Sequence, residues 1–188
     1  MSSTPAVHSV HFYESHESLI NRLAGVVASG LESGNSVLIV ATAKHREQLV
    51  NALERTDIDV ELQVRETRFR MYDAEAMLST FMVNGMPDER RFMASVGKQL
   101  LNAASAAINS EQGLTVFGEM VAVLWEEGNK NGALALETLW NDLLNERAFH
   151  LHCAYPRALF NADQMGLLNV CESHSHILGV LTPQLAAA

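Results

Sequence analysis

Apolar residues along this chain form short continuous runs that alternate with longer segments in which they recur every three or four positions. The run Ser-Val-Leu-Ile-Val-Ala at 36–41 is apolar on both faces, as is typical of a central parallel strand. Runs of this kind predict strands at residues 8–13, 36–41, 68–72, 114–117 and 149–155. The periodic segments predict helices at residues 17–30, 43–55, 74–82, 89–109, 119–127, 130–146 and 162–178. Residues 60–64 are expected to form an extended piece or a loop.

Strands and helices alternate along the chain, which is typical of an α/β protein with helices on both faces of a sheet. We therefore expect a single three-layer domain with a mainly parallel sheet of five or more strands. A length of 188 residues fits one domain. The domain is expected to span residues 8–178, with flexible termini at 1–7 and 179–188. Thr42 and Asp73 stand where they would cap the helices that follow them.

The overall charge argues against direct binding of nucleic acid. The formal net charge is −9, and only 13 residues are Lys or Arg. The densest basic group, Arg65, Arg68 and Arg70, is expected to form a solvated face at a strand edge. No apolar run approaches the ~20 residues needed to cross a membrane. The N-terminal residues lack a secretory pattern and the two cysteines fit a reducing compartment, so we expect a cytoplasmic protein.

The turn after the first predicted strand is unsuited to phosphate. It reads Glu14-Ser15-His16-Glu17, which is acidic and bulky where a phosphate needs bare backbone amides and positive charge. Neither glycine-rich phosphate motif is present in the sequence, and no Gly-x-Ser-x-Gly elbow is present either. We therefore expect no cofactor and no enzymatic activity.

Polar and aromatic residues collect where the predicted strands end. Because the carboxyl ends of parallel strands meet at one edge of a sheet, these side chains should converge there. They offer hydrogen-bonding groups and aromatic surface but no complete acid, base and nucleophile set, which favours binding over turnover. The predicted ligand-binding residues are His11, Tyr13, Glu14, Thr42, His45, Asp73, Glu119, Trp125 and Tyr155.

A second possibility is a metal or haem site built from histidine and cysteine. His150 and His152 lie two apart in a strand, and Cys171 and His174 lie three apart on a predicted helix. Such pairs share a face of their element and could supply soft ligands. The candidate metal ligands are His150, His152, Cys153, Cys171 and His174. Unrelated histidines on half-buried faces remain the competing interpretation.

Several short motifs follow one another in order along the chain. They are His11-Phe12-Tyr13-Glu14, Ala41-Thr42-x-x-His45-Arg46, Asp73-Ala74, Phe81-Met82-x-x-Gly85-x-Pro87-Asp88, Phe92, Phe117-Gly118-Glu119-Met120-Val121, Leu124-Trp125, Leu136-Glu137-x-Leu139-Trp140-Asn141 and Cys153-Ala154-Tyr155-Pro156. In this order they resemble the MEDS domain, the sensory domain named for methanogens, methylotrophs and a dichloromethane-responsive regulator. The resemblance covers roughly residues 8–178. Family members often carry His, two residues and then Phe-Tyr-Glu, whereas here Ser9, Val10 and His11 separate His8 from Phe12.

The resemblance implies a core similar to the RecA and KaiC ATPases without their phosphate loop. It also implies a sensory role, in which a small organic ligand or a partner protein is bound and the signal passes to a histidine kinase or transcriptional regulator. A homo-oligomer is a further possibility. The alternatives are a degenerate nucleotide-binding protein or hydrolase that uses Glu119 as general base, and the metal or haem sensor.

Overall fold

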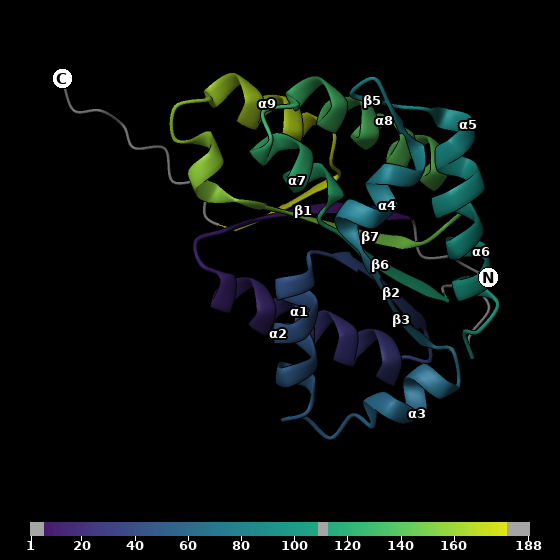
Figure 1. The fold of residues 1–188 in the computed structure, drawn as a ribbon. Helices are drawn as coiled ribbons and strands as arrows, with labels where there is room; N and C mark the ends of the chain where they lie inside the picture. Colours follow the sequence, from purple (N-terminus) through teal and green to yellow (C-terminus); the bar gives the residue numbers. More distant parts are fainter. Residues whose placement is uncertain (1–5, 109–112, 180–188) are drawn as a thin grey trace.

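The computed structural model describes residues 6–108 and 113–179, and its centre is a parallel sheet with helices on both faces (Figure 1). Six strands pair in the order β3-β2-β6-β7-β1-β8, and every pairing is parallel. The predicted α/β fold with a mainly parallel sheet is thus confirmed. The strands are β1 (Val7–Tyr13), β2 (Ser36–Ala41), β3 (Phe69–Asp73), β6 (Leu114–Gly118), β7 (His150–Pro156) and β8 (His176–Leu178).

The helices form an outer layer on each face of the sheet (Figure 1). One face carries α1 (His16–Glu32), α2 (Ala43–Leu53) and α3 (Val60–Arg65). The other face carries α4 (Ala74–Phe81), α5 (Glu89–Phe92), a π-helical segment (Met93–Gly97), α6 (Lys98–Ala104), α7 (Met120–Glu126), α8 (Lys130–Glu146) and α9 (Gln164–Glu172). Short connections are the hairpin β4 (Met82–Val83) and β5 (Met86–Pro87), and a 3₁₀ turn (Arg157–Phe160).

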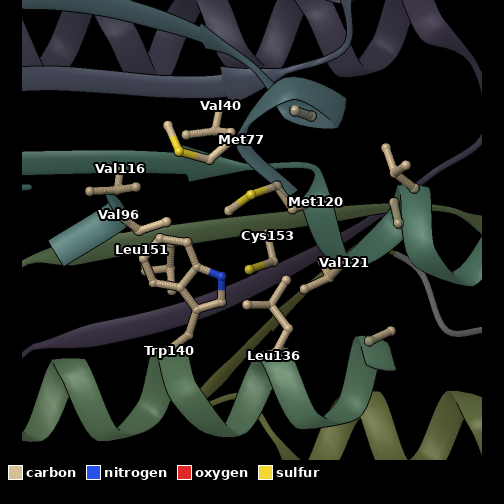
Figure 2. Close-up of a cluster of buried hydrophobic side chains, with 14 of the residues drawn as sticks. Val40, Met77, Val96, Val116, Met120, Val121, Leu136, Trp140, Leu151 and Cys153 are labelled. Atoms are coloured by element: carbon tan, nitrogen blue, oxygen red, sulfur yellow. The ribbon is translucent and has the colours of Figure 1, made fainter. Parts of the chain in front are cut away.

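Side chains that alternate along each strand divide the interior into two hydrophobic cores. On β1, Val10 and Phe12 join the core beneath α8, whereas Tyr13 joins the core beneath α1 and α2. On β7, Cys153 belongs to the α8 side and Ala154 to the other. Figure 2 shows the α8-side core, where Cys153 lies close to Leu136 and Trp140 of α8.

Helix capping follows the sequence pattern at three strand-to-helix turns. Thr42 accepts a hydrogen bond from the His45 amide, and Asp73 accepts one from Ala76, so both predicted caps are confirmed. Ser15 caps α1 in a reciprocal capping box with Ser18. These caps fix where each helix leaves the carboxyl edge of the sheet.

Two of the predicted elements are wrong. Residues 60–64 were expected to be extended or looped, but Asp59 caps a helix there through the Leu62 amide. The predicted helix 162–178 ends at Glu172, and His176–Leu178 instead pairs with the open edge of β1. At residues 60–64 the apolar pattern did not separate helix from strand, and the Asp59 cap favours the helix. At residues 176–178 the helical periodicity was misleading, because the free edge of β1 pairs with this segment.

The predicted helix at 89–109 and the basic group also need correction. The helix passes through the π-helical segment and ends at Ala104, and residue 109 lies outside the described ranges. Arg68 is buried, because its guanidinium donates to the carbonyls of Leu31 and Asn35 at the end of α1. Arg65 lies on α3, so the three arginines do not share a strand face. Of the predicted flexible termini at 1–7 and 179–188, residues 1–5 and 180–188 lie outside the described residues.

Among the residues that the structure describes, none of the helices has the length and apolar character needed to cross a membrane.

Two glycines of α1 offer a matched test of how closely this helix approaches the sheet. A Cβ atom on Gly30 would lie 2.9 Å from Val37 Cγ2 and 3.3 Å from Thr115 Oγ1, whereas one on Gly25 would meet nothing within 4 Å. We expect Gly30→Ala to lower the free energy of unfolding by about 1–3 kcal/mol, since Val37 is fully buried and cannot move aside.

Gly25→Ala is the control, and urea denaturation of both variants is the measurement. The second substitution should leave stability unchanged or raise it by up to about 1 kcal/mol, because alanine favours helix more than glycine. Equal effects of the two substitutions would contradict the close packing of α1 on β2 and β6.

Candidate functional site

A cavity of about 240 Å³ lies at the carboxyl edge of the sheet, where β1, β2 and β6 end. In parallel sheets this edge is where ligands bind. The cavity has a charged and imidazole-rich side, together with an apolar wall from α7. It is lined by Tyr13, His16, Thr42, Lys44, His45, Glu119, Ala122, Val123 and Glu126, and we refer to it as the rim cavity.

A buried carboxylate organises the rim cavity. Glu119 directly follows β6 and is 2 % exposed. Its Oε2 accepts a hydrogen bond from the Thr42 amide at 2.8 Å, and its Oε1 contacts Nδ1 of His45. Glu119 therefore holds both the first turn of α2 and the His45 ring. Buried carboxylates persist in folded proteins when partners of this kind replace water.

The hydrogen bonds continue from His45 to the surface. Nε2 of His45 lies 2.6 Å from Nδ1 of His16, an exposed residue at the start of α1. Where Nδ1–H of His45 donates to the Glu119 carboxylate, Nε2 of His45 accepts from Nδ1–H of His16. Nε2 of His16 is then left as a hydrogen-bond acceptor. The result is a chain from a buried carboxylate to the exterior, Glu119–His45–His16, which we call the imidazole chain.

Burial and neighbouring charges set the protonation of the other cavity groups. Burial and the charges of Glu119 and Glu126 raise the pKa of Tyr13, so its phenol stays protonated. Partial desolvation, the Lys44 ammonium and His45 lower the pKa of His16 below its usual value. Partial desolvation and the Glu119 charge raise the pKa of Glu126. The cavity thus presents hydrogen-bonding groups but no activated hydroxyl or thiol.

Four of the predicted ligand-binding residues come together at the rim cavity: Tyr13, Thr42, His45 and Glu119. Whether they bind a ligand stays a prediction. Sequence reasoning missed His16, Lys44 and Glu126, which also line it. His16 and Lys44 stand within three residues of the ends of β1 and β2, so their position was a usable signal.

Three further predicted residues lie near this edge but do not line the rim cavity. Glu14 is exposed and lines a neighbouring hollow of about 280 Å³. Asp73 forms an ion pair with Arg46 at 2.7 Å in addition to its capping role. His11 lines a narrow recess with Ser9 and Arg22, beneath α1. These three residues therefore lie near the carboxyl edge of the sheet without lining the rim cavity.

Trp125 and Tyr155 do not line the rim cavity. Trp125 is 3 % exposed, and its ring packs against Tyr155 and Phe160 in the α8-side core. Tyr155 is fully buried and donates a hydrogen bond to Glu137. The helical turn of α7 directs Ala122, Val123 and Glu126 to the cavity and places Trp125 in the core.

The five predicted metal ligands do not share one site, because neighbouring side chains on a strand point to opposite faces. His150 and His152 line a hollow of about 530 Å³ beside α1, near the amino ends of β6 and β7. Cys153 lies on the opposite face, beside Glu137. His174 is also near Glu137, whereas Cys171 is half-buried against the same core without joining them.

A comparison with protein-family models matches residues 7–175 to MEDS, described as the MEthanogen/methylotroph, DcmR Sensory domain. The match covers most of the 188 residues and confirms the resemblance drawn from the motifs. A comparison with curated proteins gives no match.

Glu126 provides a test of the electrostatics of the rim cavity. A carboxyl group whose pKa is raised in the folded state adds stability below its usual pKa and loses it as the pH rises through the folded value. We therefore expect Glu126→Gln to be more stable than the parent at pH 7, by roughly 0.5 kcal/mol since the group is exposed. This gain should vanish as the pH falls toward 4.

Urea denaturation at several pH values measures this difference, with Glu127→Gln as the control. Glu127 is the exposed residue that directly follows α7, and it does not line the rim cavity. An equal gain in both variants would assign the effect to net charge rather than to the proximity of Glu119.

Proposed function

The chain belongs to the MEDS family of sensory domains, and on this premise we propose that it is a non-enzymatic sensor that binds a small organic molecule in the rim cavity. The bound state would be passed to a partner protein such as a histidine kinase or transcriptional regulator, or to a second copy of the chain. The observation that carries the proposal is the imidazole chain, which links the rim cavity to the buried Glu119.

The size and lining of the rim cavity favour a small ligand with both polar and apolar parts. At about 240 Å³ it is smaller than the roughly 300–1,000 Å³ of pockets for drug-sized molecules. Nε2 of His16 can accept a hydrogen bond, and Ala122 and Val123 supply apolar wall. An alcohol, amine or amide with a short carbon skeleton fits this chemistry.

The imidazole chain also suggests how binding would be transmitted. A ligand that donates to Nε2 of His16 polarises the same ring that donates from Nδ1 to His45, and His45 shares Glu119 with the Thr42 amide. The first turn of α2 is therefore coupled to the occupancy of the rim cavity. A ligand shifts a conformational equilibrium only if its affinity differs between the two conformations, so the proposal requires two positions of this turn.

Ligand titrations followed by NMR test the proposal. The probes are one- to six-carbon alcohols, amines and amides, and the signals are the Val123 methyl and Tyr13 ring resonances. We expect saturable shifts with at least one probe, and His16→Ala should weaken its affinity at least about fivefold, because one good hydrogen bond is lost.

His176→Ala is the control, because His176 is an exposed histidine on β8 that does not line the rim cavity. Two results would sink the proposal: the absence of saturable shifts for every probe, or equal affinities in parent and His16→Ala. A loss of affinity in His176→Ala would indicate a non-specific effect.

The second candidate function is a degenerate nucleotide-binding protein or hydrolase. The pairing of Glu119 with His45 favours it, because a carboxylate that orients an imidazole is a common acid–base arrangement. Against it, the short β1–α1 turn holds the acidic Glu14, and the Ser18 amide is used by the capping box. The lining of the rim cavity also lacks a cysteine or serine nucleophile.

Calorimetry with ATP and GTP separates the two functions. We expect no binding at millimolar nucleotide and no hydrolysis, because nothing in the β1–α1 turn neutralises phosphate charge. Hydrolysis that is abolished in Glu119→Gln, with the fold retained by circular dichroism, would instead establish the hydrolase.

A further inference from the structure

A second group of chemically versatile side chains lies in the α8-side core, away from the rim cavity. Its members come from β1, α8, β7 and the turn between α9 and β8, and each is buried. One atom from each, two imidazole nitrogens, a thiol sulfur and a carboxylate oxygen, lies within 4.8 Å of the others. The group consists of His8, Glu137, Cys153 and His174, and we call it the buried quartet.

Four of the six distances between these atoms lie in or close to the range for ligands of a tetrahedral metal ion. Metal–ligand bonds of about 2.0–2.3 Å place the ligand atoms of a tetrahedron roughly 3.3–3.8 Å apart. Oε2 of Glu137 lies 3.4 Å from Nε2 of His8 and 3.5 Å from Nε2 of His174. The Cys153 sulfur lies 3.4 Å from His8 Nε2 and 3.9 Å from Glu137 Oε2. Little movement is needed to close around an ion.

The outer nitrogens of both histidines are fixed by backbone or amide oxygens. Nδ1 of His174 donates to the Val170 carbonyl at 2.7 Å. Nδ1 of His8 donates to Oδ1 of Asn141 at 2.8 Å, and the Asn141 amide is itself oriented by a hydrogen bond to the Ser173 carbonyl. These bonds place the protons on Nδ1 and leave the Nε2 lone pairs directed at Glu137. Metal-binding histidines are commonly oriented in this way.

The Glu137 carboxylate is also oriented by a hydrogen bond. The Tyr155 hydroxyl donates to Oε1 of Glu137 at 2.7 Å, which leaves Oε2 toward the two histidines and the cysteine. Figure 2 shows Cys153 on the face of β7 that points toward α8, beside Leu136 and Trp140. The quartet is therefore enclosed by apolar core on this side.

Without a cation, one polar atom of the quartet is left unsatisfied. Nε2 of His174 is fully buried and has no hydrogen-bond partner within residues 6–108 and 113–179. An Nε2 lone pair that faces a carboxylate oxygen at 3.5 Å is repelled by it. A divalent cation would satisfy both atoms, and its charge would balance one thiolate and one carboxylate in the low-dielectric interior.

We propose that the buried quartet binds one divalent transition-metal ion of the zinc class. Two imidazole nitrogens, a thiolate and a carboxylate are a ligand set suited to Zn²⁺ or Co²⁺ rather than to Mg²⁺ or Ca²⁺. The Cys153 proton leaves to solvent as the ion enters. All four positions are filled by protein, which is typical of a structural or regulatory centre. The ion ties β1, β7, α8 and the α9–β8 turn together.

Titration of the full chain with Co²⁺, with any histidine tag removed, tests the proposal directly. We expect one Co²⁺ per chain, with strong visible absorption of a tetrahedral centre and a thiolate-to-cobalt charge-transfer band. Cys153→Ala should abolish that band, and Cys171→Ala, the matched control, should retain it. Addition of Zn²⁺ should displace cobalt and raise the melting temperature.

A second pair of variants keeps the test decisive if Cys153→Ala fails to fold. His174→Gln should weaken Zn²⁺ affinity at least about tenfold in a chelator competition, because one ligand is lost. His176→Gln, two residues later and exposed, should leave the affinity unchanged. Absence of stoichiometric Co²⁺ binding, a charge-transfer band that survives Cys153→Ala, or equal Zn²⁺ affinities for His174→Gln and His176→Gln would overturn the proposal. None of these outcomes depends on a ligand in the rim cavity.

Discussion

The alternation of side chains along parallel strands is the constraint on which the arrangement of both sites depends. β1 sends His8, Val10 and Phe12 toward α8, and it sends Tyr13 toward α1 and α2. The parallel register of β1 with β7 then brings His8 and Cys153 together on one face, within 3.4 Å. The same alternation leaves His150 and His152 on the opposite face, so His152 and Cys153, which are adjacent in sequence, lie in different environments.

Glu119 has a comparable role at the carboxyl edge. Its position directly after β6 places a charged group where three strands end and where α2 begins. The backbone amide of Thr42 and the ring of His45 replace the water that burial removes. Since His45 also contacts His16, one buried carboxylate connects the start of α2 to the start of α1. A sensory domain needs a coupling of this kind between a surface pocket and its scaffold.

The rim cavity and the buried quartet differ in solvent exposure. This difference fits the two proposed roles, reversible binding of a ligand and tight binding of a structural metal ion. The rim cavity contains exposed residues such as His16 and Glu126, so a ligand can enter and leave. The buried quartet is enclosed, and its histidines are held by outer hydrogen bonds. On our proposals the first responds to a small molecule and the second fixes the elements around it. Membership in the MEDS family agrees with the first role at the level of a sensory domain.

The sequence by itself determined the α/β class, most strands, the caps at Thr42 and Asp73, and the strand-end position of Glu119, because these follow from local periodicity and turn chemistry. It could not tell that Glu126 faces the rim cavity while its neighbour Trp125 on α7 faces the core. Nor could it predict that residues 176–178 add a strand to the free edge of β1. The partners His16 and Glu137 were also decided by tertiary structure. Each comes from a helix whose rotation and packing depend on the whole core, and contacts between residues far apart in the chain leave no local pattern.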